Sequence, residues 1–221
     1  MDHAGAIFDM DGVLFDTERV YQQTWHELAG ERQINLGSGF LKAITGTNGE
    51  RMRRVVEEYY QVSDGLAVME ECMKRMREKL AAHVPVKDGV PEILRFFREQ
   101  GVRMAVASSS LPGQIEANLR GAGIRDYFDA VVSGTEVERG KPAPDIFLRA
   151  AERIGCRAED CFVFEDSENG VRAGHAAGCI TVMVPDMIDP SETIRPYCAW
   201  ICRDFFEVRG KIDRIRSHFS V

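Results

Sequence analysis

Several features that would place a protein in a particular class are missing from this chain of 221 residues. No apolar stretch is long enough to cross a bilayer, for which about 20 residues are needed. Residues 1–5 carry no basic region and lead directly into an apolar run, so we do not expect a signal peptide. Internal repeats and low-complexity segments are also absent. The chain is therefore not expected to span a membrane or to be secreted.

Metal-binding cysteine pairs are missing as well. The six cysteines are scattered without CxxC pairs or clustered histidines, and this spacing gives neither a zinc site nor a disulfide framework. Cys161 and Cys179 lie beside or within apolar runs, where we expect them to be buried as small hydrophobic side chains. A reducing cytoplasm is the simplest compartment for such a chain.

Excess positive charge is absent, because the formal net charge is −7. This charge argues against nucleic acid or an anionic membrane as the main partner. A small anionic molecule can still bind if local positive charge or a metal offsets the overall field. The chain length fits one good-sized domain, or a core domain with a smaller inserted one, and a monomer is the default expectation.

The sequence does contain short apolar runs rich in Val, Ile and Phe, which are typical of buried strands. They lie at 6–8, 102–107, 130–132, 161–164 and 180–184, with a weaker candidate at 199–201.

Amphipathic helical patterns separate these runs. One begins at Val90 and ends before Gly101, one begins near Pro112, and one begins at Pro144. A fourth, rich in small residues, begins at Gly170. Strand and helix alternate and the strands are fully apolar, so we predict an α/β fold, a doubly wound parallel sheet covered on both faces.

One segment departs from this alternation. From about Thr17 to Val84 there is no convincing strand, and helical patterning dominates, with methionines at helical spacing that are expected to pack internally. We therefore predict an α/β core formed by 1–16 plus 85–221. Residues 17–84 would form a small all-α domain inserted after the first strand.

Two carboxylates stand one residue apart where the first predicted strand ends. Side chains alternate along a strand, so Asp9 and Asp11 can converge on one point, and Gly12 allows the backbone to turn there. One carboxylate can attack an electrophile while the other moves a proton, and the pair can also hold a hard cation. Taken alone, the run is equally well interpreted as an Asp-rich turn.

Polar residues also follow the second and third predicted strands, at the sheet edge where ligands bind. The hydroxyls and backbone N–H groups of Ser108 and Ser109 suit an anion, while Ser110 suits the capping of the next helix. Lys141 lies in a loop stiffened by prolines, where it can contact a phosphate or a carboxylate cluster. A loop lysine is more often simply solvated.

Adjacent acids follow the fourth predicted strand. Glu165 and Asp166 would face Asp9 and Asp11 across the sheet. Four carboxylates at one edge repel each other strongly without a cation, which leads us to expect Mg²⁺.

The four elements together are more specific than any one of them. DxDG after the first strand, Ser after the second, Lys before a helix and Glu-Asp after the fourth resemble the haloacid dehalogenase superfamily, in its phosphatase and β-phosphoglucomutase-like branch. The resemblance covers essentially the whole chain, and the helical insert corresponds to a cap. It implies a Rossmann-like core, Mg²⁺ as cofactor and a small phosphorylated metabolite as substrate.

By this resemblance, Asp9 is the nucleophile that forms an aspartyl-phosphate. Asp11 protonates the leaving group and then deprotonates the water that cleaves the intermediate. Mg²⁺ would be held by the Asp9 carboxylate, the Asp11 backbone carbonyl and Asp166, with Glu165 beside the metal. Haloacid dehalogenases proper lack the second acid, so Asp11 argues against dehalogenation.

The resemblance also implies the residues that bind substrate. Ser108, Ser109 and Lys141 would contact the phosphoryl oxygens. Gly46, in the loop of the insert, and Asp16, at the hinge, are further candidates for substrate contact.

The acceptor of the phosphoryl group separates two alternatives. β-Phosphoglucomutases carry a histidine at the position of Tyr21, whereas the nearest histidine here is His26. They also use basic residues around the cap loop, and Lys42 and Arg51 do not match these cleanly. We therefore expect a phosphatase acting on a small sugar or polyol phosphate, with a mutase as the alternative.

A third alternative is a binding protein that has kept the fold and lost turnover. Loss of Asp9, Asp11 or Asp166 would indicate this, and all three are present.

Overall fold

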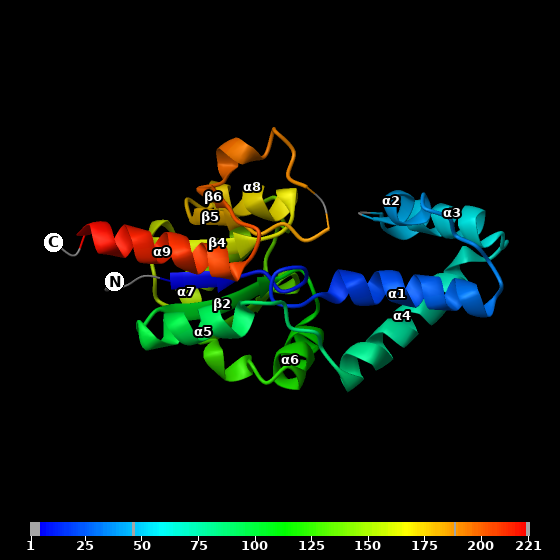
Figure 1. Ribbon diagram of the computed structural model, residues 1–221, viewed down its shortest axis with the longest axis horizontal. Coiled ribbons are helices and arrows are strands. Elements are labelled where there is room, and N and C mark those ends of the chain that lie inside the picture. Colours follow the sequence, from blue (N-terminus) through cyan, green and yellow to red (C-terminus); the bar gives the residue numbers. More distant parts are fainter. Residues whose placement is uncertain (1–4, 46, 188, 220–221) are drawn as a thin grey trace. The chain divides into compact units, whose positions relative to one another are not determined.

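The structure, a computed structural model, describes residues 5–45, 47–187 and 189–219, with side chains described through residue 214. The contacts divide the chain into two compact units (Figure 1). One unit is Met1–Asp16 with Val84–Val221, and the other is Thr17–His83. Val84, which the sequence-based division placed in the insert, packs in the core of the first unit.

The described residues of the first unit form a six-stranded parallel sheet in the order β3-β2-β1-β4-β5-β6. The strands are β1 (Gly5–Phe8), β2 (Arg103–Ser108), β3 (Ala130–Ser133), β4 (Cys161–Glu165), β5 (Ile180–Met183) and β6 (Trp200–Ile201). Each strand begins and ends within one residue of its predicted range. The chain moves from β1 outward to β3 and then returns to β4 on the other side of β1. The predicted doubly wound sheet is confirmed, and the strand order reverses at β1, the point in such sheets beside which ligands usually bind.

Helices cover the two faces of this sheet. They are α5 (Val90–Glu99), α6 (Pro112–Gly121), α7 (Asp145–Arg153), α8 (Glu168–Ala176) and α9 (Phe205–Phe219), with short 3₁₀ turns η1 (Arg125–Tyr127), η2 (Gly134–Glu136), η3 (Ala158–Asp160) and η4 (Arg195–Tyr197). Phe8 packs with residues of α5, α6 and α9, whereas its neighbour Ile7 packs with residues of α7 and α8. The alternation of side chains along β1 thus divides the core into two layers.

Aromatic contacts fix the centre of the first layer. The Phe8 ring stacks on Phe164 with centroids 4.8 Å apart and meets Phe97 edge to face at 6.2 Å. Cys161 and Cys179 are buried, as predicted. Since β1 and β4 are held side by side by these contacts, the acids that follow them start from neighbouring, rigid positions.

The second unit is helical throughout its described residues. It contains α1 (Thr17–Glu31), α2 (Phe40–Ile44), α3 (Gly49–Tyr60) and α4 (Gly65–Ala82). Trp25 lies at its centre, in edge contact with Phe40 and Tyr60, and the Tyr60 hydroxyl donates to the Trp25 carbonyl at 2.6 Å. Met69 packs against this cluster but Met73 is 39% exposed, so the prediction of internal methionines is correct only in part.

The two chain segments that lead into and out of the helical unit pair with each other within the first unit. Phe15 forms an antiparallel bridge with Val86, and the Asp16 N–H donates to the Pro85 carbonyl at 2.9 Å. The Lys87 N–H donates to the Leu14 carbonyl at 3.0 Å. This pairing fixes the residues directly after the DxDG motif.

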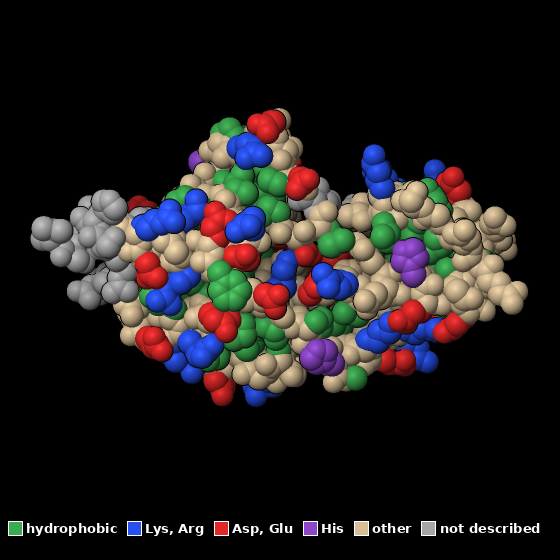
Figure 2. Space-filling model, in the orientation of Figure 1, with side chains coloured by type: hydrophobic (Ala, Val, Ile, Leu, Met, Phe, Trp, Pro, Cys, Tyr) green, Lys and Arg blue, Asp and Glu red, His purple; other side chains and the backbone are tan. Residues whose placement is uncertain are grey.

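The surface is charged in a mixed way. Acidic and basic side chains are interspersed on the face drawn in Figure 2. Many ion pairs join residues one turn apart on a helix, such as Arg53 with Glu50 and Arg149 with Glu152. Exposed pairs of this kind contribute little to stability. Among the helices of the described residues, none combines the length and the apolar character needed to span a membrane.

Candidate active site

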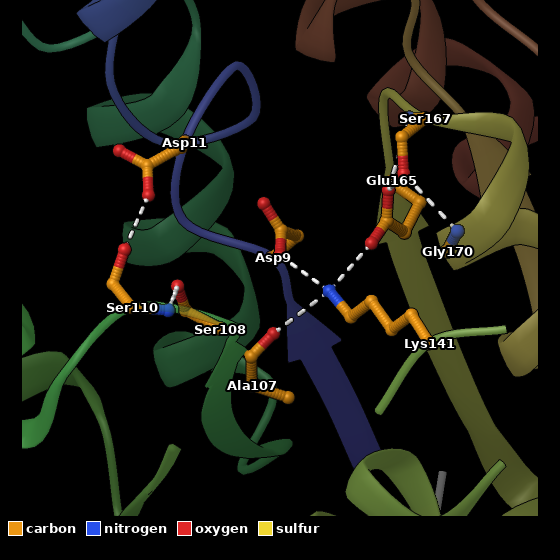
Figure 3. A network of polar contacts seen from close by, with 9 residues as sticks. All are labelled: Asp9, Asp11, Ala107, Ser108, Ser110, Lys141, Glu165, Ser167 and Gly170. Carbon is orange, nitrogen blue, oxygen red and sulfur yellow. Dashed lines mark hydrogen bonds and ion pairs between the residues drawn. The ribbon is translucent and has the colours of Figure 1, made fainter. Parts of the chain in front are cut away.

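The carboxyl ends of β1, β2 and β4 bring predicted site residues together at one edge of the sheet (Figure 3). Asp9 follows β1, Ser108 ends β2 and Glu165 ends β4. The Asp9 N–H donates to the Phe164 carbonyl at 3.0 Å, which continues the sheet pairing past the end of β1. The backbone of Asp9 is therefore fixed by the sheet itself.

Lys141 lies at the centre of this group. Its Nζ is 2.5 Å from Asp9 Oδ1, 2.6 Å from Glu165 Oε1 and 3.2 Å from the Ala107 carbonyl oxygen (Figure 3). The side chain is only 8% exposed, and its ammonium also lies 4.9 Å from the centre of the Phe147 ring. The interpretation of Lys141 as a solvated loop residue is therefore wrong. Its ammonium is buried, and its contacts with two buried carboxylates compensate for the loss of hydration.

Burial and charge act in opposite directions on these groups. Burial raises the pKa of Asp9, Lys141 opposes that shift, and Glu165 adds to it. Burial alone would lower the pKa of Lys141, but Asp9 and Glu165 outweigh it, and the Lys141 pKa lies above its ordinary value. Lys141 is thus a permanent cation beside a carboxylate that resists ionisation.

Glu165 is almost completely buried and faces Lys141 with one oxygen. Its Oε2 accepts hydrogen bonds from the Ser167 N–H at 3.0 Å and the Ser167 hydroxyl at 2.9 Å. A Cβ on Gly170 would lie 1.8 Å from Glu165 Oε1, so only glycine fits at the start of α8. We expected Glu165 beside a metal, but these contacts favour a role in holding Lys141.

Asp166 lies next to the DxDG turn. Gly12 has a positive φ of 81°, and a Cβ there would approach Asp166 Oδ2 to 2.2 Å. Burial raises the pKa of Asp166, and the negative charges of Glu165 and Asp9 raise it further. The Asp166 carboxylate is thus close to the turn that carries the other acids.

The four acids lie close enough to affect one another: beyond the effect of burial, Glu165 and Asp11 raise the pKa of Asp9, and Glu165 and Asp9 raise the pKa of Asp166. In the part of the chain that the structure describes, however, no three His, Cys, Asp or Glu side chains are grouped so that they could hold a metal ion. The Glu165 carboxylate faces Lys141, and the Asp11 carboxylate faces Ser110. Asp9 and Asp166 remain, and the negative charge of Asp9 raises the pKa of Asp166. Carboxylate oxygens such as those of Asp9 and Asp166 are ligands that suit a hard cation.

Asp11 points away from the lysine cluster. Its Oδ2 accepts a hydrogen bond from the Ser110 hydroxyl at 2.9 Å (Figure 3). The Ser110 N–H donates in turn to Ser108 Oγ at 3.1 Å. The prediction that Ser110 caps the next helix is wrong, because Leu111 is the first flanking residue of α6 and no side chain caps that helix. The sequence did contain one indication of the contact with Asp11: Ser110 lies two residues beyond Ser108, just after a strand that neighbours β1.

The other predicted site residues differ in their surroundings. Ser108 is buried, and its hydroxyl, although it accepts a bond from Ser110, keeps a proton to donate to a ligand. Ser109 is exposed beside it, and Asp16 is half-buried at the end of the first unit. Gly46 lies outside the described residues.

Sequence reasoning missed a second lysine at this edge. Lys87 Nζ donates to the Gly12 carbonyl at 2.8 Å and is 2.6 Å from Asp186 Oδ1. Asp186 Oδ2 is buried with no hydrogen-bond partner among the described residues. Lys87 and Asp186 are 99 residues apart in the chain. Neither lies in a recognisable motif, so only the folded chain reveals the contact.

Comparison with known proteins identifies relatives over most of the chain. Fructose-1-phosphate phosphatase YqaB of Escherichia coli is 35% identical over 183 residues, which are 82% of this chain and 96% of that protein. A phosphorylated carbohydrates phosphatase of Thermotoga maritima is 31% identical over 173 residues, covering 78% of this chain and 80% of the other.

Solved structures agree with these sequence relatives. A HAD family hydrolase from Deinococcus radiodurans R1, solved with bound phosphate and sodium, superposes with a TM-score of 0.83 at 27% identity, and the match covers 96% of each chain. A family model for haloacid dehalogenase-like hydrolases matches residues 3–178. Fold, site residues and relatives agree, and the chain belongs to the haloacid dehalogenase-like hydrolase family.

Proposed function

We propose that this protein is a Mg²⁺-dependent phosphatase that hydrolyses a small phosphate monoester through an aspartyl-phosphate on Asp9. The observation that carries the proposal is the contact of Asp9 with Lys141: a buried carboxylate at a strand end, 2.5 Å from a buried ammonium. Lys141 fixes the carboxylate in one orientation and favours its ionised, nucleophilic form.

In the first step, Asp9 attacks the phosphorus of the substrate. Lys141 holds Oδ1, and we assign the attack to Oδ2. A new Asp9 O–P bond forms while the P–O bond to the alcohol breaks. The departing alkoxide takes a proton from Asp11, so the products of this step are a free alcohol and the aspartyl-phosphate.

In the second step, water attacks the phosphorus of the aspartyl-phosphate. Asp11, now ionised, takes a proton from this water, and the bond between phosphorus and Asp9 breaks. Inorganic phosphate leaves and both carboxylates return to their starting state. Asp11 thus acts as acid and then as base, which requires that it meet first the leaving oxygen and then the water.

The phosphoryl oxygens need donors of their own. The buried Ser108 hydroxyl and the exposed Ser109 lie where β2 ends, and Lys141 carries positive charge to the same edge. We assign these three residues to the phosphoryl group, because donors fixed before the reaction stabilise charge that grows in the transition state.

The donor set of Asp9, Asp166 and the Asp11 carbonyl fits Mg²⁺, which takes oxygen ligands and retains several waters. When bound, Mg²⁺ supplies positive charge that neutralises the phosphoryl oxygens and the two carboxylates. Since burial and like charge raise the pKa of both carboxylates in the metal-free protein, metal binding is expected to release protons.

Sugar and polyol phosphates are the proposed substrates. The relatives named as phosphatases of fructose 1-phosphate and of phosphorylated carbohydrates support this class. We assign substrate selection to the inserted unit Thr17–His83 as a cap, with Asp16 and Gly46 as candidate contacts. A reducing cytoplasm suits such a metabolite, and the enzyme needs no partner chain for the chemistry described.

The test is phosphate release from p-nitrophenyl phosphate and from a panel of sugar and polyol phosphates, with Mg²⁺ and with a chelator. We expect turnover with Mg²⁺ and loss of turnover with the chelator. No release from any substrate at saturating Mg²⁺ would overturn the proposal. An isomerisation assay with β-glucose 1-phosphate runs beside it, and efficient production of glucose 6-phosphate would identify a mutase instead.

A further inference from the structure

The proposed acid–base residue is held by a series of serine contacts that reaches across two neighbouring strands. The Ser110 hydroxyl donates to Asp11 Oδ2 at 2.9 Å. The Ser110 N–H donates to Ser108 Oγ at 3.1 Å, and the Ser110 carbonyl accepts from the Ser133 hydroxyl at 2.7 Å. Ser110 is therefore tied at its N–H, its carbonyl and its side chain.

The two serines that hold Ser110 are themselves rigid. Ser108 ends β2 and Ser133 ends β3, where the two residues stand in register as a pair in the parallel sheet. Both are buried. Because the backbone of Ser110 is fixed from both strands, its one rotatable side-chain bond places the hydroxyl in a small set of positions. One of these positions meets Asp11.

Asp11 needs such an orienting contact more than Asp9 does. It is half-buried rather than enclosed, and Figure 3 shows its carboxylate turned toward Ser110 and away from Lys141. A hydroxyl donates a charge-assisted hydrogen bond to an ionised carboxylate. When the acid is neutral, the oxygen of the same hydroxyl can accept a hydrogen bond from the O–H of the acid. Ser110 can thus contact Asp11 in both of its protonation states.

We propose that Ser110 is the positioning residue for Asp11, which it orients for proton transfer to the leaving alkoxide and from the attacking water. This inference rests on the proposed phosphatase function. Ser110 acts through Asp11 and is not assigned to the phosphoryl group, which separates it from Ser108 and Ser109. Its removal should therefore matter only where proton transfer limits the rate.

The leaving group provides a test of this kind. Phenolate leaves poorly without a proton, whereas p-nitrophenolate is a stable anion that needs none. The ratio kcat/KM reports the steps through departure of this group, and so it excludes the later attack of water. We expect Ser110→Ala to lower kcat/KM for phenyl phosphate about tenfold or more, and to change that for p-nitrophenyl phosphate by less than about twofold.

Three further variants complete the experiment. Ser110→Thr keeps the hydroxyl and should retain most of the activity on phenyl phosphate. Ser63→Ala, at an exposed serine between α3 and α4, should leave both substrates unaffected. In an Asp11→Asn background, Ser110→Ala should add no further loss on phenyl phosphate, because the group through which it acts is gone.

Each outcome decides the question. Equal losses on both substrates would assign Ser110 to the phosphoryl group and overturn the inference, as would an unchanged kcat/KM for phenyl phosphate. A further loss in the Asp11→Asn background would also overturn it. If the wild-type protein with Mg²⁺ hydrolysed neither substrate, the proposed function would fail rather than the role of Ser110. Thermal melts of each variant show whether the fold is intact.

Discussion

Asp9 and Asp11 stand two residues apart in the chain, but the structure gives them opposite surroundings. Asp9 is enclosed, and a buried lysine holds it together with the buried Glu165. Asp11 is half-buried and meets a neutral hydroxyl, Ser110. Asp9 lies beside a permanent charge that favours its ionised form against the effect of burial, whereas Asp11 is held by a group that can hydrogen-bond to it in either protonation state.

This difference suits the two tasks that the reaction requires. A nucleophile must stay ionised and fixed, and the ammonium of Lys141 contributes both. A residue that gives and takes a proton must change its charge in each cycle, which a close permanent cation would oppose. The environment of each residue, rather than its type, therefore separates the two roles.

Removal of each carboxylate in turn tests this separation most strongly. Asp9→Asn should abolish turnover of every substrate, because no nucleophile remains. Asp11→Asn should lower turnover of alkyl phosphates by about 10²–10⁴-fold, the usual contribution of an acid–base group, while formation of the intermediate from p-nitrophenyl phosphate persists. Stopped-flow release of p-nitrophenolate compares the two variants at the step that forms the intermediate. Comparable losses at that step in the two variants would remove the distinction.

Loss of the buried cation should affect stability as well as activity. Lys141→Met leaves Asp9 and Glu165 buried without the cation that pairs with both, which is expected to cost about 3–5 kcal/mol in the free energy of unfolding. Urea unfolding measures the loss, and Lys74→Met, at an exposed lysine on α4, is the matched control. If both variants unfolded at the same urea concentration, Lys141 would have no special role in the buried cluster.

Removal of the Asp166 carboxylate should increase the stability of the metal-free protein, whereas removal of Lys141 decreases it. Its pKa in the folded state lies above its ordinary value, so the folded protein binds the extra proton and stability falls as pH rises through that window. Asp166→Asn should therefore flatten the fall and stabilise the chelated protein at pH 8 by about 1–3 kcal/mol. The same variant should gain little from added Mg²⁺. A destabilised Asp166→Asn protein in chelator would contradict the raised pKa.

Substitution of Ser167, which hydrogen-bonds to Glu165, should have the smallest effect on stability. Ser167→Ala removes a hydroxyl that donates to Glu165 Oε2 and accepts from the Gly170 N–H at the start of α8. We expect a loss of about 1 kcal/mol in the free energy of unfolding, typical of a helix cap. Ser191→Ala is the control, since its hydroxyl contacts only a neighbouring threonine among the residues described. Equal unfolding midpoints would show that Glu165 is held without Ser167.

Much of the fold was accessible from the sequence, because buried parallel strands appear as apolar runs and helices as periodic ones. The strands β1 and β4 could be predicted in this way, and with them the meeting of Asp9 and Glu165 at one sheet edge. Proline and glycine marked several helix ends, although α7 begins at Asp145, one residue after the predicted Pro144.

The direction in which each side chain points could not be predicted from the sequence. Spacing placed Asp11 and Glu165 at the right edge, but it could not show that Asp11 turns to Ser110 and Glu165 to Lys141. Those orientations depend on which hydrogen-bond partner replaces water when the side chain is buried, and that partner comes from a distant segment of the chain. The pairing of Lys87 with Asp186 is a similar case, since it forms only when the return from the insert meets the loop after β5.

The proposed mechanism depends on phosphorylation of Asp9, and the contrast with Asp11 allows a direct measurement. Asp11→Asn should form the aspartyl-phosphate from p-nitrophenyl phosphate and hydrolyse it slowly, because the base for water is missing. Acid quenching, borohydride reduction and peptide mass spectrometry would then locate the modified residue. We expect reduction at Asp9 in the substrate-treated protein and none without substrate. An unmodified Asp9, or modification at another carboxylate, would contradict it.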